Sequence, residues 1–341
     1  MNFSEFRIWF DNNFSNLLEQ KIHLFSSLSK NTDVPDIISY VLKIAQNGKR
    51  FRPFLIYRAS GLYRKDCEKH FLLFASVELL HIFALIHDDI MDEADSRHGV
   101  ICAHKKFAKK YGESTSKAIG ILLGDVVFAW AYECLYEYTA EFPKLRNRIV
   151  EEFTRLVSEV THGQILDVLS PAQPPLNEKA IVEKMTLKTA RYSFVQPLRL
   201  GFVVCGDNSI DQSFAEDFGL ALGIGFQLQD DLLDGAPTIQ TGKTRYIDIQ
   251  SGQQTLLSWY MQHKASSKEQ EKFITFFGKK DMYEKEQDQL FELFESSGAH
   301  QYIKAQSDLY FTVASEAINT YRTSDSIQWE NIISLVQGRK K

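Results

Sequence analysis

Hydrophobic residues recur every three to four positions along nearly the whole chain, which is the spacing of an amphipathic α-helix. The alternation with period two that marks a half-buried strand is nearly absent. The pattern predicts several helices between about 252 and 337, and before them long helices at about 4–29, 36–46, 53–63, 67–92, 114–140, 144–169, 179–205 and 210–234. It therefore predicts an all-α fold.

One proline-rich segment, at 170–177, interrupts the helical pattern near the middle of the chain. The pattern keeps the same character on both sides of this segment. Pro35 and Pro53 stand instead near the starts of predicted helices, where a proline costs little. We therefore expect one domain that spans residues 1–341.

Composition and charge narrow the classes of function. Glycine (18) and proline (8) are sparse for 341 residues, which favours helices over a sheet interrupted by turns. The net charge of −5 gives no general positive field, so we expect no nucleic-acid partner. The four cysteines lie far apart and form no CxxC pair, which favours reduced thiols and a cytoplasmic protein.

Two segments bear on membrane association. The amino-terminal residues include Glu5, Arg7 and Asp11, so we do not expect a signal peptide there. The most apolar run, 71–87, is short, contains Glu78 and is followed by paired aspartates. We interpret this run as a buried core helix and expect no transmembrane segment.

The motif Asp-Asp-x-x-Asp occurs twice, each time at the end of a strongly apolar predicted helix. The first acidic cluster is Asp88, Asp89 and Asp92, and the second acidic cluster is Asp230, Asp231 and Asp234. Aspartates four positions apart lie one turn apart on one helix face, where like charges repel. The helix macrodipole also disfavours anions at a C-terminus. A hard cation that accepts oxygen ligands, such as Mg²⁺, would offset this repulsion.

A single acidic cluster of this kind can be no more than a solvated helix end. Two identical clusters favour a shared role, in which metal ions bridge one diphosphate and the apolar helix faces line a pocket. A charged head and a long hydrocarbon tail are the two halves of a prenyl diphosphate.

Cations also gather near these acids. The basic loop, residues 48–53, carries Lys49, Arg50 and Arg52 before a helix, and arginine binds phosphate oxygens in bidentate fashion. The alternative for this loop is a solvated charged turn. Arg97 stands just after the first acidic cluster and is similarly placed to bind phosphate oxygens.

Polar residues also interrupt the later helices. Lys188 and Thr189 lie in an otherwise apolar helix, where an unpaired lysine is costly. Gln227 precedes Asp230 by about one helical turn. It is either a site residue or a core glutamine satisfied by a neighbour.

With these motifs in this order, the chain resembles the trans-isoprenyl diphosphate synthase family (polyprenyl synthetases), which includes farnesyl and geranylgeranyl diphosphate synthases. The matching segments, from Gly48 to about Gly252, are GKRFRP, ELLHIFALIHDDIMDEADSRHG, LLGD, KTARYSF, GIGFQLQDDLLD and GKTRYIDI. The resemblance implies a bundle of long antiparallel helices around a deep central cavity, and a homodimer. It also implies a Mg²⁺-dependent prenyltransferase that condenses isopentenyl diphosphate with an allylic diphosphate.

The resemblance implies roles for individual residues. Three Mg²⁺ ions would be bound by the two acidic clusters, with Asp88, Asp92 and Asp230 as main ligands, Asp89, Asp231 and Asp234 beside them, and Asp248 assisting. Isopentenyl diphosphate would be bound by Lys49, Arg52 and His81. The allylic diphosphate would be bound by Arg97, Lys188 and Lys243, with Thr189 and Gln227 near the reacting carbons.

The implied mechanism begins with the departure of a diphosphate whose charge metals and cations neutralise. The allylic carbocation that forms is kept from water by the apolar pocket and attacked by the double bond of isopentenyl diphosphate. The released pyrophosphate is the expected base for the final proton, because no histidine or glutamate is obviously placed for it.

The chain departs from the family pattern at two places in particular. His98 stands where the family usually has a second arginine that helps bind isopentenyl diphosphate, so we expect weaker or pH-dependent binding. Gln253 and Gln254 stand where a second loop lysine is usual. These changes leave the ionisation chemistry intact and bear on the condensation partner.

Product length should be set on the helix that ends at Asp88, because one helical turn of about 5.4 Å is close to one isoprene unit. Phe83 and Ala84 lie five and four positions before Asp88, and the motif has no insertion. This combination resembles the geranylgeranyl (C20) type, with C15 and C25 products as alternatives. Phe83 can also be a core residue only, with Leu79, Leu80 or a dimer-partner residue as the floor.

Two other functions use the same scaffold. A class I terpene cyclase ionises a prenyl diphosphate without condensation, and His98 and Gln253 are the points in its favour. A non-catalytic subunit of a heteromeric synthase would be expected to have degraded acidic motifs, whereas both motifs here are complete.

Overall fold

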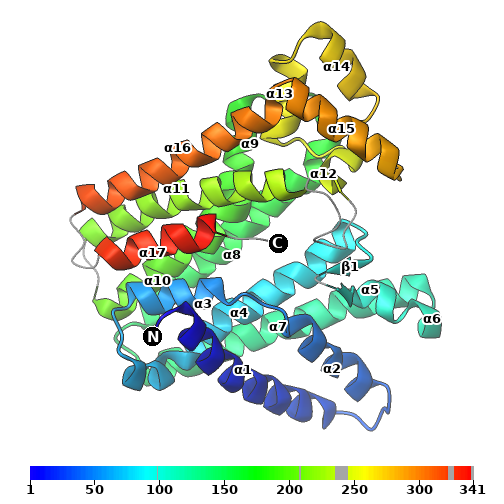
Figure 1. Cartoon of the computed structure of the whole chain (residues 1–341). Helices are drawn as coiled ribbons and strands as arrows, with labels where there is room; N and C mark the ends of the chain where they lie inside the picture. Colours follow the sequence, from blue (N-terminus) through cyan, green and yellow to red (C-terminus); the bar gives the residue numbers. More distant parts are fainter. Residues whose placement is uncertain (98, 207–208, 235–244, 322–325, 339–341) are drawn as a thin grey trace. The chain divides into compact units, whose positions relative to one another are not determined.

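Helices form where the hydrophobic pattern predicts them. The computed structural model describes residues 1–97, 99–206, 209–234, 245–321 and 326–338, and nearly all of their regular structure is helical (Figure 1). The helix predicted at 67–92 is observed at Cys67–Met91, and the helix predicted at 210–234 is observed at Ser209–Asp234. The prediction of an all-α fold is confirmed.

The described residues divide into two compact units. Unit 1 comprises Met1–Glu151 with Leu200–Gly206, and unit 2 comprises Glu152–Arg199 with Asp207–Lys341. Two helices, α8 (Arg146–Leu169) and α10 (Gln196–Cys205), contribute residues to both units. The single domain and the central cavity stay predictions.

Unit 1 contains the first part of the helical fold. The long helices are α1 (Phe3–Ser26), α2 (Val34–Ala45), α3 (Phe51–Ala59), α4 (Cys67–Met91) and α7 (Glu113–Glu141). The short elements are η1 (Arg64–Asp66), α5 (Ala103–Lys106) and α6 (Ala108–Tyr111).

The core of unit 1 lies along α4, which packs against α7 over much of its length (Figure 1). Leu73, Val77 and Leu80 of α4 are fully buried. They lie on one face of the helix, because they are four and three positions apart. Ala75 and Ser76, which point to other sides, are fully buried as well, so α4 is covered on several sides, as expected for a core helix. The first acidic cluster stands at the end of this buried rod.

Two helical segments are long and apolar enough to cross a membrane by length and composition alone, Arg64–Met91 and Glu113–Glu141. The sequence-based view that the run 71–87 is too short and too polar is therefore wrong on these two criteria. The most apolar stretch of the first segment is 61% buried within the protein, as in a core helix of a globular protein.

A small hairpin follows α4. Strand β1 (Ser96–Arg97) pairs antiparallel with β2 (Val100–Ile101), with Arg97 opposite Val100. Gly99, with φ 78°, supplies the left-handed backbone that a tight turn requires. The sequence analysis did not predict these strands, because two residues are too few to show a period of two.

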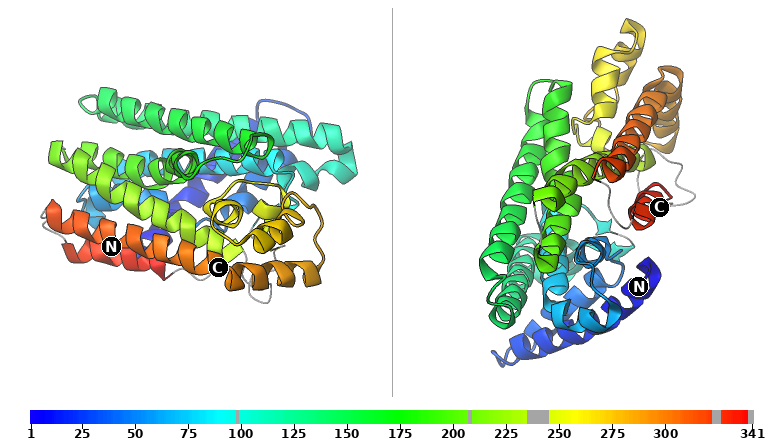
Figure 2. Two further views of the ribbon diagram at one scale, coloured as in Figure 1. Left: turned by 90° about the horizontal axis from the view of Figure 1, so that it is seen from above. Right: turned by 90° about the vertical axis from the view of Figure 1, so that its left-hand side faces the viewer.

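Unit 2 contains the remaining helices and the second acidic cluster. They are η2 (Ser170–Ala172), α9 (Glu178–Met185), η3 (Thr186–Val195), α11 (Ser209–Asp234), α12 (Ile247–Gln250), α13 (Leu256–His263), α14 (Ser267–Ile274), α15 (Glu284–Ser296), α16 (Ala299–Thr320) and α17 (Ser326–Gln337). The view from above in Figure 2 shows α16 (orange) running along α11 (yellow-green).

The helix predicted at 179–205 is continuous but changes type inside. Residues Thr186–Val195 form a π-helix, η3, between two α-helical parts. Helices of this type are rare and are frequently found at functional sites. In this chain the π-helix carries Lys188 and Thr189.

Two glycines let neighbouring helices approach η3 closely. A Cβ atom on Gly163 of α8 would lie 2.4 Å from the backbone nitrogen of Lys188, and one on Gly223 of α11 would lie 2.4 Å from Ala190 Cα. Since no side chain fits at either position, both glycines are needed for this packing. They fix η3 between α8 and α11.

Candidate functional site

The first acidic cluster lies at the C-terminus of α4 in unit 1. Asp88 is half-buried and Asp89 buried, and Asp92 is the exposed residue that ends the helix. Arg97 of β1 contacts both of the first two aspartates, with its Nη2 2.8 Å from Asp88 Oδ2 and its Nε 2.6 Å from Asp89 Oδ1. The hairpin therefore folds a cation back onto the acids.

Arg97 stays charged in this position. Burial alone would lower the pKa of its guanidinium, but the carboxylates of Asp89 and Asp88 outweigh that effect and raise the pKa. In this structure the positive charge offsets the repulsion between the two carboxylates. Arg97 is thus adjacent to the first acidic cluster, as its predicted role in binding an anion requires.

The basic loop in unit 1 presents only part of its charge outward. Lys49 is exposed and Arg52 is half-buried at the start of α3, and His81 of α4 is half-buried. Arg50 is buried, and its backbone adopts the left-handed region with φ 57°. Lys49 and Arg52, which were predicted to bind substrate, are therefore more exposed to solvent than Arg50.

Arg50 is a structural residue of unit 1. Its Nη1 donates to Glu78 Oε1 at 2.6 Å, its Nε to Asp11 Oδ1 at 2.7 Å and its Nη2 to the Ala45 carbonyl at 2.5 Å. The guanidinium also lies over the ring of Phe14. The expectation that Arg50 belongs to a phosphate clamp is wrong, because it ties α1, α2 and α4 together.

The predicted chain-length residues lie one turn and more before Asp88. The Phe83 ring is 4.6 Å from the Phe128 ring of α7, measured between centroids, and 4.7 Å from the His87 ring. Phe83 and Ala84 are half-buried. Phe83 is therefore one member of an aromatic pair that joins α4 to α7, and the sequence analysis did not identify its partner.

The second acidic cluster lies at the C-terminus of α11 in unit 2. Asp231 is buried, and Asp230 and Asp234 are half-buried. Gln227, one turn earlier, donates to Asp231 Oδ1 at 2.8 Å and accepts from Thr189 Oγ1 at 2.6 Å. The predicted pair Thr189 and Gln227 is therefore joined directly to the second acidic cluster.

Asp248 of α12 adds a further carboxyl group. Burial raises its pKa, and the negative charges of Asp167 and Asp230 add to the rise, with Lys188 and Lys184 acting in the opposite sense. Burial likewise raises the pKa of Asp231 well above its ordinary value, with the charge of Asp248 next in effect. These carboxyl groups are crowded and call for additional positive charge.

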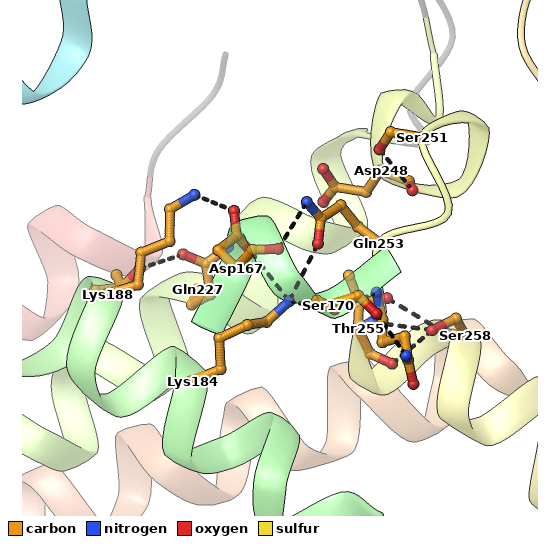
Figure 3. Close-up of polar contacts among 12 residues, drawn as sticks. Asp167, Ser170, Lys184, Lys188, Gln227, Asp248, Ser251, Gln253, Thr255 and Ser258 are labelled. Carbon is orange, nitrogen blue, oxygen red and sulfur yellow. Dashed lines mark hydrogen bonds and ion pairs between the residues drawn. The ribbon is translucent and has the colours of Figure 1, made fainter. Parts of the chain in front are cut away.

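Two lysines lie beside these acids (Figure 3). Lys188 of η3 lies 2.5 Å from Asp167 Oδ2, and Lys184 of α9 lies 3.0 Å from Asp167 Oδ1. Burial raises the pKa of Asp167, but the two lysines outweigh this effect and hold it below its ordinary value. The sequence analysis identified Lys188 but not Lys184 or Asp167, because their partners are remote in sequence.

The donor set of unit 2 fits a hard divalent cation. Carboxylate oxygens are the ligands that Mg²⁺ prefers, and it keeps several positions for water or substrate phosphate. Within the described parts of the chain, no three His, Cys, Asp or Glu side chains form a complete site by themselves. This arrangement suits a metal that is bound jointly by protein and diphosphate.

The structure therefore brings Lys188, Thr189, Gln227, Asp230, Asp231 and Asp248 together in unit 2. It brings Arg97, Asp88 and Asp89 together in unit 1. His98 and Lys243 lie outside the described residues. The predicted ligand and substrate roles stay predictions.

Comparisons with known proteins agree with this chemistry. The family model for polyprenyl synthetase matches residues 34–294. The chain is 30% identical to a geranylgeranyl diphosphate synthase of Sulfolobus acidocaldarius over 73% of each chain, and 30% identical to a short chain isoprenyl diphosphate synthase of Methanothermobacter thermautotrophicus over 83% of each.

The fold has a solved counterpart. A geranylgeranyl pyrophosphate synthase from Corynebacterium glutamicum, crystallised with isoprenyl diphosphate and magnesium, aligns over 100% of both chains with a TM-score of 0.89 and 23% identity. The all-α fold is that of the isoprenyl synthases. With acidic motifs, adjoining cations and more than two thirds of its length matched, the chain belongs to the polyprenyl synthetase family and is a prenyltransferase.

Proposed function

We propose that this chain is a Mg²⁺-dependent synthase that condenses isopentenyl diphosphate with an allylic diphosphate to give a short-chain prenyl diphosphate of the C20 type. The observation that carries the proposal is the polar cluster of unit 2, where Asp230, Asp231 and Asp248 adjoin Lys188. Acids for metal ions and a cation for phosphate oxygens stand within one group of side chains. The names of the relatives support the same reaction.

The two acidic clusters would hold magnesium, which neutralises the diphosphate so that it can leave as a stable anion. We expect three ions, bound mainly through Asp88, Asp92 and Asp230. The magnesium present in the Corynebacterium glutamicum structure supports the identity of the metal.

Arg97 would act as the exchangeable cation of the first acidic cluster. Here it is paired with Asp88 and Asp89. With Asp88 and Asp89 holding metal instead, its guanidinium would be available to bind the oxygens of the allylic diphosphate, in the bidentate geometry that suits arginine. One residue thus stabilises the acids before substrate arrives and the substrate afterwards.

The remaining residues would position the two substrates. Lys49, Arg52 and His81 bind isopentenyl diphosphate, and Lys188 binds the allylic diphosphate together with Lys243. The Thr189 hydroxyl, oriented by its hydrogen bond to Gln227, lies near the reacting carbons. Holding both substrates in reacting orientation is the main contribution that such a site makes.

The C20 assignment rests on Phe83. Its ring packs against Phe128 and would form an aromatic floor five residues before Asp88. The printed names of the relatives from Sulfolobus acidocaldarius and Corynebacterium glutamicum support this length.

We also propose a cytoplasmic homodimer. The helix α7 exposes Leu122 and Tyr136, which are 62% and 73% accessible. Apolar groups exposed together on one helix are typical of a subunit interface. The family resemblance supports the same assembly.

Product analysis tests the proposed function. The purified chain is incubated with Mg²⁺, isopentenyl diphosphate and allylic diphosphates of five, ten or fifteen carbons, and the products are identified by chromatography. We expect a C20 diphosphate from each starter. A C15 or C25 product would correct the length alone, whereas hydrocarbon released without isopentenyl diphosphate would favour a terpene cyclase. An inactive purified chain would favour a non-catalytic subunit.

A further inference from the structure

Lys184 is a buried cation of unit 2 to which the proposed function gives no role. Its side chain is 8% exposed, compared with 29% for Lys188. Its Nζ lies 3.0 Å from Asp167 Oδ1 and 3.4 Å from both Ser170 Oγ and Gln253 Oε1 (Figure 3). Burying an ammonium group is costly, so a second lysine on the same carboxylate requires an explanation.

Charge neutralisation alone does not require both lysines. Asp167 has two carboxylate oxygens, and each accepts from a different lysine. One lysine would suffice to neutralise one carboxylate, so the group of three carries a net positive charge.

The geometry gives the two lysines different tasks. Lys184 is held by three protein oxygens and is the fixed partner, whereas Lys188 has the more accessible amine. With one oxygen of Asp167 bound to Lys184, the other oxygen is aimed at Lys188. Lys184 thereby fixes the position from which Lys188 reaches a bound anion.

We propose that Lys184 is a positioning residue for the allylic diphosphate: through Asp167 it orients Lys188, and it supplies at this place the positive charge that Gln253 lacks. This inference rests on the proposed function, since it names a residue that serves the same site.

Gln253 lies where a substituted lysine could replace the charge of Lys184. Its Oε1 accepts from Lys184, and its Nε2 lies 3.3 Å from the Asp167 carbonyl oxygen. A side chain at 253 therefore reaches the same place from the opposite direction (Figure 3). A lysine at 253 would restore the charge that a Lys184→Gln substitution removes.

The experiment compares the variants Lys184→Gln, Lys184→Gln with Gln253→Lys, and Lys179→Gln. Lys179 is an exposed lysine on the same helix and serves as the matched control. We expect Lys184→Gln to raise KM for the allylic diphosphate about tenfold, with a smaller change in kcat, as for loss of an outer residue that orients a ligand. The double variant should recover most of this loss, and Lys179→Gln should behave as the wild type.

A purely structural role for Lys184 predicts a different set of results. Lys184→Gln would then lower the melting temperature with KM unchanged, or the double variant would not recover KM; either result would overturn the proposal. If Lys184→Gln does not fold, the isosteric Asp167→Asn variant takes its place. It should raise the same KM, because it removes the link to Lys188, and an unchanged KM would likewise overturn the proposal.

Binding without turnover separates this proposal from the proposed function. Calorimetry with Mg²⁺ and an unreactive thiodiphosphate analogue of the allylic substrate measures the same affinity. If the wild type binds the analogue but forms no elongated product, the proposed function fails while Lys184 can still be judged. If the wild type elongates normally and Lys184→Gln binds the analogue as tightly, the positioning role fails alone.

Discussion

At the residue scale, Arg50 and Lys49 show how adjacent cations serve different purposes. Arg50 is buried against Glu78 and Asp11, whereas Lys49 is exposed. The left-handed backbone of Arg50 turns its side chain inward, so the same basic loop both closes the core and faces outward. The two residues should therefore fail in different ways when replaced.

Replacing Arg50 with methionine should destabilise the fold by about 3–5 kcal/mol, because it leaves the buried carboxylate of Glu78 unpaired. Urea denaturation measures this loss. Lys49→Met is the control: it should change the free energy of unfolding by less than about 0.5 kcal/mol, while raising KM for isopentenyl diphosphate. Equal stability of the two variants would contradict the structural role of Arg50.

Phe83→Ala should lengthen the product if Phe83 forms the proposed floor, because the substitution removes the ring that packs against Phe128. One further isoprene unit corresponds to about one helical turn. Chromatography of the dephosphorylated products measures the chain length. Unchanged product length would remove Phe83 from this role.

The acid sensitivity of unit 2 should depend on Asp167, whose pKa lies below its ordinary value of 3.8. A carboxyl group with a lowered pKa stabilises the folded state above its ordinary pKa, and this contribution is lost as pH falls through the folded-state pKa. Asp167→Asn should therefore be less stable than the wild type by about 3 kcal/mol near neutral pH.

The same difference should shrink as Asp167 becomes protonated. Unfolding of both proteins is followed at about pH 6 and about pH 3, on either side of the ordinary pKa. A stability difference that is the same at both pH values would show that the charge of Asp167 has no part in it.

At the scale of elements, the π-helix η3 depends on how closely α8 and α11 approach it. Gly163 and Gly223 allow this close packing because they have no side chain. The packing in turn fixes the positions of Thr189 and Lys188, which η3 carries. The side chains at this site are thus positioned by backbone packing as well as by hydrogen bonds.

Gly223→Ala should destabilise the protein by about 1–3 kcal/mol, because the new methyl group displaces Ala190 and with it η3. Activity should fall by more than the loss of folded protein accounts for, because η3 carries Lys188 and Thr189. Gly225→Ala on the same helix is the matched control, since its Cβ would meet only the Phe311 ring at 3.2 Å. Thermal denaturation and steady-state kinetics measure both effects. An equal loss in the two variants would contradict a special role for the Gly223 contact.

Some elements were predictable from local sequence and others were not. The ends of α4 and α11 were predictable because a dense hydrophobic period stops at an Asp-Asp-x-x-Asp motif in each. The β1–β2 hairpin was too short to show a period. The π-helix was missed because it differs from an α-helix by one residue in each hydrogen-bonded turn, which leaves no mark in the hydrophobic pattern.

The candidate site shows the same division. The acidic clusters were recognised from residues four positions apart. The roles of Arg50 and Lys184 depend instead on partners remote in sequence: Glu78 is 28 residues from Arg50, and Gln253 is 69 residues from Lys184. Side chains brought together by tertiary folding leave no signal in one sequence alone.

At the scale of the whole molecule, we propose that the two acidic clusters, one in each unit, serve one prenyl-transfer reaction. The two acidic clusters differ in the cations beside them. Arg97 balances the first acidic cluster, and Lys188 and Lys184 adjoin the second. Among the described residues, no three His, Cys, Asp or Glu side chains are grouped so that they could hold a metal ion. The central proposal is that prenyl transfer needs both acidic clusters.

The most direct test is the rate of prenyl transfer, with Mg²⁺ present, in Asp88→Ala, Asp230→Ala and the double variant. Asp95→Ala is the control, because Asp95 is an exposed aspartate near the first acidic cluster with no assigned role. We predict that each single variant loses about 10²–10³-fold in kcat, that the double variant loses far less than the product of the two losses, and that the control keeps its rate. Full activity in the double variant, or losses that multiply independently, would contradict a joint role of the two acidic clusters in prenyl transfer.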